Sequence, residues 1–160
     1  MYLAPQYLRT FLVTCVCAGR RSLFQVDKHA ELLLSLLQED RAKKRYQLHA
    51  FVFMPDHIHL LTTPAPQISL EKAIQFVKGG FSFRLRFAGQ VWERGRFDRR
   101  IPDLQAFAAC KAYIHANPVR ARLVASAERF PYSSAGRPEL VDACPAWMQA
   151  RAEALTLGDC

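Results

Sequence analysis

The sequence predicts an α+β fold, with helices packed on one face of a small antiparallel sheet. Apolar, β-branched runs suited to strands alternate with segments whose leucines repeat at helical spacing. Two of the strands are separated only by Pro55-Asp56, a pair suited to a tight turn, so they form a hairpin. With 160 residues, 51% apolar and 22% charged, the composition is that of one globular domain with its own core.

The first half of the chain supplies a strand, a helix and the hairpin. Residues 11–18 are β-branched and apolar, as in a strand, and residues 27–44 carry leucines at helical spacing with a basic C-terminal end. Residues 47–54 and 57–63 are the two strands of the hairpin.

The second half supplies two helices and one more strand. Ser69 is a suitable N-cap for a helix, and residues 91–97 follow as a strand. Asp103 caps a last helix, which is expected to end at Asn117 because Pro118 stops it. The order strand, helix, hairpin, helix, strand, helix is similar to that of ferredoxin-like and RRM-like folds.

The charge indicates a polyanionic partner. Twenty-two Lys and Arg outweigh fourteen Asp and Glu, for a formal net charge of +8, and arginines are concentrated in residues 84–100. Arginine donates two parallel hydrogen bonds to phosphate oxygens, which favours nucleic acid over the alternative of a merely solvated basic surface. No run is apolar enough to span a membrane and no signal peptide is visible, so we expect a cytoplasmic protein. The five cysteines form no C-x-x-C pair, which argues against a zinc ribbon.

Two groups of residues carry candidate chemistry. His57 and His59 alternate in a strand with Ile58, so both imidazoles point to one face and can converge on a divalent metal. Tyr113 and Asn117 are four apart and share a helix face, where the Asn oxygen is a suitable third ligand beside a phenol. The alternatives are hydrogen-bonded strand histidines, a tyrosine at the core edge and an asparagine that ends a helix.

These motifs together resemble a known family, the single-tyrosine HUH transposases of the IS200-like type. Within it the chain is most similar to the REP-associated tyrosine transposases (RAYTs), whose HUH motif (histidine, hydrophobic, histidine) corresponds to residues 57–59. The similarity implies a catalytic domain over residues 1–134, with residues 135–160 as a tail that packs on it or extends from it. The matching segments are FLVTCVCAGRRSLF (11–24), FVFMPDHIHLL (51–61), VWERGRFDRRI (91–101), YIHANPVRARLV (113–124) and FPYSS (130–134).

The resemblance implies a specific reaction. Tyr113 would attack a phosphodiester of single-stranded DNA and form a 5′-phosphotyrosine, next to Mg²⁺ or Mn²⁺ held by His57, His59 and Asn117. The implied substrate is hairpin DNA of the REP type, and the enzyme is a monomer or a homodimer. By position, the candidate DNA contacts, with Trp92 or Phe97 available to stack on a base, are Lys78, Arg84, Trp92, Arg94, Arg96, Arg99, Arg100 and Arg120.

Three residues depart from the family pattern, and other functions remain open. Asp56 replaces the usual Asn before the HUH motif, Arg122 replaces a Gly, and Tyr132 replaces a common Trp. The same residues are compatible with a noncatalytic RRM-like nucleic-acid-binding module, or with a metal-dependent phosphodiesterase that uses water. A replication initiator or relaxase would use the same tyrosine chemistry.

Overall fold

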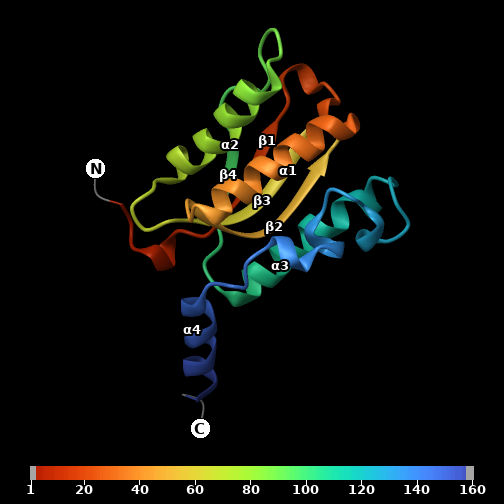
Figure 1. Cartoon of the computed structure of the whole chain (residues 1–160). Coiled ribbons are helices and arrows are strands. Elements are labelled where there is room, and N and C mark those ends of the chain that lie inside the picture. The colour runs from red at the N-terminus through yellow and green to blue at the C-terminus, as the bar shows by residue number, and fades with distance from the viewer. Residues whose placement is uncertain (1–2, 158–160) are drawn as a thin grey trace.

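A four-stranded antiparallel sheet forms the centre of the protein (Figure 1). The structure is a computed structural model and describes residues 3–157. The strands lie side by side in the order β2-β3-β1-β4, and the predicted hairpin at Pro55-Asp56 joins β2 to β3. Their bounds are β1 Phe11–Val16, β2 Tyr46–Met54, β3 His57–Pro64 and β4 Phe97–Arg100.

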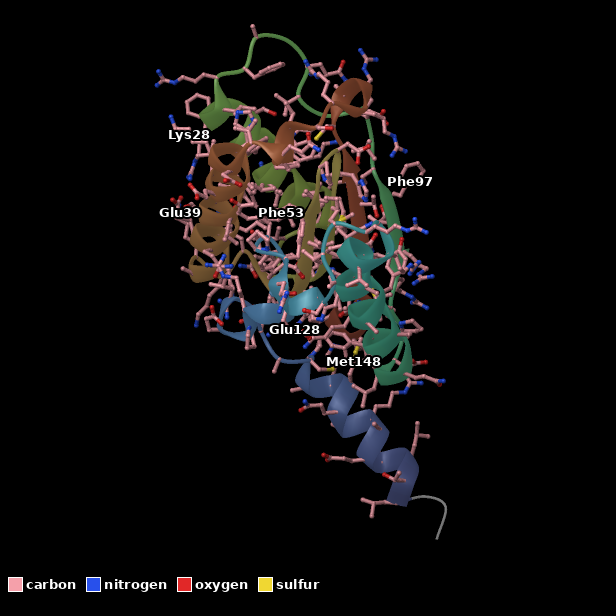
Figure 2. All side chains as sticks on the ribbon, turned by 90° about the vertical axis from the view of Figure 1, so that its right-hand side faces the viewer. Lys28, Glu39, Phe53, Phe97, Glu128 and Met148 are labelled. Atoms are coloured by element: carbon pink, nitrogen blue, oxygen red, sulfur yellow. The ribbon has the colours of Figure 1, made fainter. Side chains whose placement is uncertain are left out.

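Helices cover both faces of the sheet, which corrects the prediction that they pack on one face only. Helices α1 (Asp27–Ala42) and α2 (Leu70–Leu85) lie on one face, and α3 (Leu104–Arg120) lies on the other (Figure 1). Strands β2 and β3 are buried on both faces, and such strands have continuous apolar runs rather than alternating ones. A fourth helix, α4 (Ala146–Leu157), projects from the body (Figures 1 and 2). The remaining elements are 3₁₀ turns at Gln6–Leu8, Ala18–Arg20, Leu23–Gln25, Ala127–Arg129, Ser134–Gly136 and Pro138–Leu140.

Side-chain caps start the two helices that begin after a polar residue. Ser69 Oγ accepts a hydrogen bond from the Lys72 N–H at 3.1 Å, and Asp103 Oδ1 accepts one from the Ala106 N–H at 2.8 Å. Both caps were predicted, and each satisfies a backbone N–H that has no partner within its helix.

The predicted strand over residues 91–97 is wrong in its position, because β4 begins only at Phe97. Trp92 forms one isolated bridge with Cys17, and the chain then turns at Gly95, whose φ of 73° is left-handed. The Trp92 ring enters the core beside Phe24, so this segment is anchored by a side chain rather than by strand pairing.

Helix α3 continues past the point where Pro118 was expected to stop it. The helix runs to Arg120, with Pro118 buried in its last turn. Proline there removes only the hydrogen bond its own N–H would have made, while the Ala121 N–H still donates to the Asn117 carbonyl at 3.0 Å. Tyr113 and Asn117 therefore both lie inside a regular helix.

Residues 132–142, which we call the closing segment, cover the outer edge of β2. The Phe53 N–H donates to the Tyr132 carbonyl at 2.9 Å, and Asp142 exchanges hydrogen bonds with the Leu48 backbone. Met148 of α4 is buried in the core under α3. Pairing of this kind covers an edge that would otherwise be exposed. At the opposite end of the sheet, all four residues of β4 are exposed.

None of the helices within residues 3–157 is long and apolar enough to cross a membrane.

Candidate active site

His57 and His59 lie side by side on the face of the sheet that α3 covers. Their ring centroids are 4.9 Å apart, and Ile58 between them is buried in the core on the opposite face. This is the arrangement that strand alternation predicts. His59 is 6% exposed, whereas His57 is only partly buried. The pair therefore forms a polar patch at the start of β3, next to the hairpin turn.

Tyr113 extends from α3 over this pair. Its ring centroid is 5.5 Å from that of His59, in an edge-to-face arrangement, and the residue is 38% exposed. The Arg120 guanidinium lies over the Tyr113 ring, 5.1 Å from its centroid. A phenol that is in contact with an imidazole and still open to solvent is available to a substrate. The tyrosine and the histidines belong to the same chain.

The course of α3 along β3 places Asn117 near the level of His57. Near the start of α3, Phe107 packs against His49, which is hydrogen-bonded to Thr63 near the end of β3. Further along α3, Tyr113 packs against His59, nearer the start of β3. The next four residues of helix advance about 6 Å, and the two residues of strand from His59 to His57 advance about 6.6 Å. The Asn117 amide donates to the Tyr113 carbonyl at 2.9 Å. Its oxygen makes no hydrogen bond within the described chain.

Each histidine is oriented by a partner at Nδ1. His57 Nδ1 is 2.7 Å from Asp56 Oδ1, and His59 Nδ1 is 2.8 Å from Thr14 Oγ1. Because an Asp carboxylate can only accept, the His57 Nδ1–H donates to it, and this leaves the Nε2 lone pair of His57 free. If the Thr14 hydroxyl accepts in the same way, both Nε2 atoms are free to bind a metal.

The surroundings of the two histidines keep His59 neutral. Burial, with a smaller contribution from neighbouring His57, lowers the pKa of His59 to about 4. Burial tends to raise the pKa of Asp56, but the contacts with His57 and Arg20 outweigh it and lower that pKa overall. A neutral imidazole beside an ionised carboxylate suits cation binding, because only the neutral ring has a free lone pair.

The donor set fits a divalent metal that accepts both nitrogen and oxygen. Residues 3–157 contain no group of three His, Cys, Asp or Glu side chains that could hold a metal ion, so a third protein ligand beside the pair must be of another type. The Asn117 amide oxygen is suitable by chemistry and by its place on α3. Two imidazoles and one amide oxygen are compatible with Mn²⁺, while Mg²⁺ prefers oxygen ligands.

Two of the predicted DNA contacts bind other residues of the protein, on the face of the sheet opposite His57 and His59. Lys78 Nζ donates to the carbonyls of Glu93 and Gly95, at 3.1 and 2.7 Å, and so holds the loop before β4. Arg84 pairs with Glu39 of α1, with one N–O distance of 3.1 Å. Both residues belong to α2, on the face of the sheet opposite α3.

Trp92 and Arg96 are also held by neighbours. Trp92 is 6% exposed, and its Nε1–H donates to the Lys78 carbonyl at 3.1 Å; its ring faces are covered, and we do not propose a stacking role for it. Arg96 Nε lies 3.2 Å from Asp98 Oδ2, an ion-pair distance without hydrogen-bond geometry.

The other predicted contacts are exposed. Arg94 lies in the loop before β4, Arg99 and Arg100 lie on β4, and Arg120 lies over Tyr113. Arg99, in register with Leu12, projects on the side of the sheet that α3 covers, whereas Arg100, in register with Phe11, projects on the opposite side.

Sequence reasoning missed the two residues that orient the histidines. Asp56 was considered only as a turn residue and as a departure from the family pattern, although its position next to His57 in the turn was a usable signal. Thr14 gave no local signal, because its contact with His59 depends on the pairing of β1 with β3. His115 is half-buried and its Nε2 lies 2.8 Å from Ser134 Oγ, so it links α3 to the closing segment.

Comparison with known proteins identifies the family. Residues 6–117 match the family described as "Transposase IS200 like", which covers the sheet, α1, α2 and α3 as far as Asn117. The chain therefore belongs to the IS200-like transposase family, and its general role is that of a DNA transposase. No curated protein matches the chain.

Solved structures show the same fold. One is a REP-associated tyrosine transposase bound to a REP hairpin: it has 19% sequence identity and a TM-score of 0.72, and the alignment covers 91% of this chain and 93% of that one. Another is a putative transposase from Deinococcus radiodurans, with 21% identity and a TM-score of 0.50, aligned over 71% of this chain and 95% of that one. The α+β fold of this chain is thus that of the RAYT structure.

Proposed function

We propose that this protein cuts and rejoins single-stranded DNA at hairpin-forming repeats, with Tyr113 as nucleophile. The observation that carries the proposal is the contact between Tyr113 and His59, with ring centroids 5.5 Å apart, on the same face as His57. Family membership and the hairpin bound to a protein of the same fold support the choice of substrate.

In the proposed reaction, Tyr113 Oη forms a bond to the scissile phosphorus and the bond to the 3′ oxygen breaks. The products are a 5′-phosphotyrosine and a free 3′-hydroxyl, which takes up the proton that the phenol has lost. Because the phosphotyrosine conserves the energy of the phosphodiester, a 3′-hydroxyl can attack it and rejoin the strand without ATP. Tyr113 reaches His59 of its own chain, which supports a monomer as the active unit.

The remaining residues have defined roles in this scheme. His57, His59 and Asn117 would hold Mn²⁺ or Mg²⁺, which supplies stabilisation of the negative charge that develops on the phosphate. Asp56 and Thr14 orient the two imidazoles through their Nδ1 atoms.

Arg120 is the cation nearest the nucleophile among the predicted contacts. Its guanidinium lies over the Tyr113 ring, where it can bind the phosphate that flanks the cleaved bond.

Covalent trapping tests the proposal. End-labelled hairpin DNA with single-stranded flanks is incubated with Mn²⁺ or Mg²⁺ and run on a denaturing gel with Tyr113→Phe, His57→Ala and the control Tyr7→Phe. We expect a metal-dependent adduct with the parent protein and with Tyr7→Phe, a tyrosine that is 50% exposed and outside the site, and none with the other two.

Two results would reject the tyrosine mechanism. Cleavage that persists in Tyr113→Phe without an adduct identifies a phosphodiesterase that uses water. Tight binding of every hairpin without cleavage identifies a binding module.

A further inference from the structure

Phe97 is an exposed aromatic side chain at the open edge of the sheet. It is the first residue of β4 and is 72% exposed, and Figure 2 shows it pointing away from the body of the protein. Exposure alone does not mark a function, because single exposed apolar residues are common. Its place relative to the histidines is the informative feature.

Phe97 lies in the same cross-strand row as His59. Thr14 of β1 pairs with Phe97 on one side and with His59 on the other. Residues paired across neighbouring strands point to the same face of a sheet. Thr14 Oγ1 and His59 Nδ1 are hydrogen-bonded, and His59 packs against Tyr113 of α3, so this face is the one under α3. Ile101, four residues after Phe97, is buried in the core on this side.

The distance from Phe97 to the site is short. Two strand spacings separate the Phe97 and His59 backbones, about 10 Å. A DNA strand whose phosphate lies at the histidines and Tyr113 can therefore pass over β4 with a neighbouring base at Phe97.

The surroundings of Phe97 suit a single strand rather than a protein partner. Arg99 projects on the same side of β4, two residues further along, and Arg94 is exposed in the loop that leads to Phe97. Aromatic rings that stack on bases, next to cations that follow the phosphates, are the usual means of binding single-stranded nucleic acid.

Phe83 is a useful contrast. It is 83% exposed but lies on α2, on the opposite face of the sheet, and its neighbour Arg84 is paired with Glu39.

We propose that Phe97 is the stacking platform of the site, on which a base next to the cleaved phosphate lies, while Arg99 contacts the backbone. This inference rests on the proposed function and deepens it, since it assigns an unpaired base, not only a phosphate, as part of what the site recognises. Because stacking needs only the face of a base, the contact tolerates any sequence.

The test separates base contacts from phosphate contacts. Two fluorescent DNA hairpins carry single-stranded tails of equal length, one of thymidines and one of abasic sites, so that only the bases differ. Binding is measured by anisotropy in the Tyr113→Phe protein, which cannot form the proposed adduct.

Phe97→Ala should weaken binding of the thymidine tail by about 5-fold to 150-fold, the equivalent of one stacked base. It should leave binding of the abasic tail unchanged, and Phe97→Trp should retain the affinity of the parent. Arg99→Ala should weaken both tails, whereas Phe83→Ala, the matched control, should weaken neither.

Two results would overturn the proposal: equal thymidine-tail binding by Phe97→Ala and its parent, or an equal loss on both tails. A parent that does not distinguish the two tails would also overturn it. The covalent adduct is scored separately with the parent sequence. An adduct together with a negative stacking result rejects the role of Phe97 alone, whereas the absence of an adduct rejects the proposed cleavage.

Discussion

Asp56 is expected to control how tightly the histidine pair binds metal. Its carboxylate accepts the His57 Nδ1–H at 2.7 Å, and the Asp56 side chain is 27% exposed. Asp56→Ala removes this acceptor, so that the ring is free to rotate and loses electron density at Nε2. Loss of such a partner typically weakens metal binding about 10-fold to 100-fold, which is about 1.4 to 2.7 kcal/mol.

The conservative variant Asp56→Asn tests how much of the metal affinity depends on the negative charge of Asp56. In Asp56→Asn the amide oxygen can still accept the same hydrogen bond, but without a negative charge. Because a charge-assisted hydrogen bond is roughly twice as strong as a neutral one, about half of the free energy should remain, and affinity should fall about 3-fold to 10-fold.

Arg20→Ala is the matched control. Its guanidinium is 3.5 Å from the other Asp56 oxygen and is 65% exposed, so its removal should change affinity little.

The assay is a titration with Mn²⁺ in which the signal of the free ion is followed by electron paramagnetic resonance. Thermal unfolding without metal checks that every variant is folded. If Asp56→Ala binds Mn²⁺ as tightly as the parent while His57→Ala does not bind, the orienting role of Asp56 is refuted. If the parent itself binds no Mn²⁺ or Mg²⁺, the metal site is refuted.

Two further predictions concern the fold that supports the site. Trp92→Ala should lower the free energy of unfolding by about 3 to 5 kcal/mol, because the side chain is buried in the core and bonded to Lys78; urea denaturation measures this, and a change below about 1 kcal/mol would contradict the buried position. Burial lowers the pKa of His49, which lies between Thr63 and Ala143, below its ordinary value of 6.5. The unfolded chain therefore takes up a proton as the pH falls through 6.5 while the folded protein does not, so stability is lost below that pH, by at most about 1.4 kcal/mol per pH unit for this one group. Urea denaturation without metal from pH 8 to pH 5 should give a shallower loss for His49→Gln than for the parent, and equal slopes would contradict this assignment.

The residues of the candidate site could be chosen from sequence because each motif is local. Strand alternation alone places His57 and His59 on one face, and helical spacing alone places Tyr113 and Asn117 together. The turn at Pro55-Asp56 and the caps at Ser69 and Asp103 are also decided by residues close in the chain. Local hydrogen bonding decides such features, so they needed no knowledge of the fold.

Features that depend on long-range packing required the tertiary structure. Whether helices cover one or both faces depends on which apolar side of the sheet each helix packs against. Contacts between residues far apart in the chain decide this, with α1 and α2 in one core cluster and α3 in the other. Pro118 was expected to end α3, yet it is buried in the last turn of the helix, where it removes only one hydrogen bond.

Packing also decided which of the basic and aromatic residues are free to bind DNA. Trp92 and Phe97 are equally suited to stacking by type, but Trp92 is buried in the core, whereas Phe97 on the edge strand is exposed, in the same cross-strand row as His59. Arg84 and Arg120 differ in the same way, since a carboxylate from another helix engages Arg84, whereas Arg120 lies over the ring of Tyr113. Sequence thus determined which chemical groups the protein has and which share a local face. Only folding decided which of them remain free to meet DNA, because burial and pairing depend on residues far away in the chain.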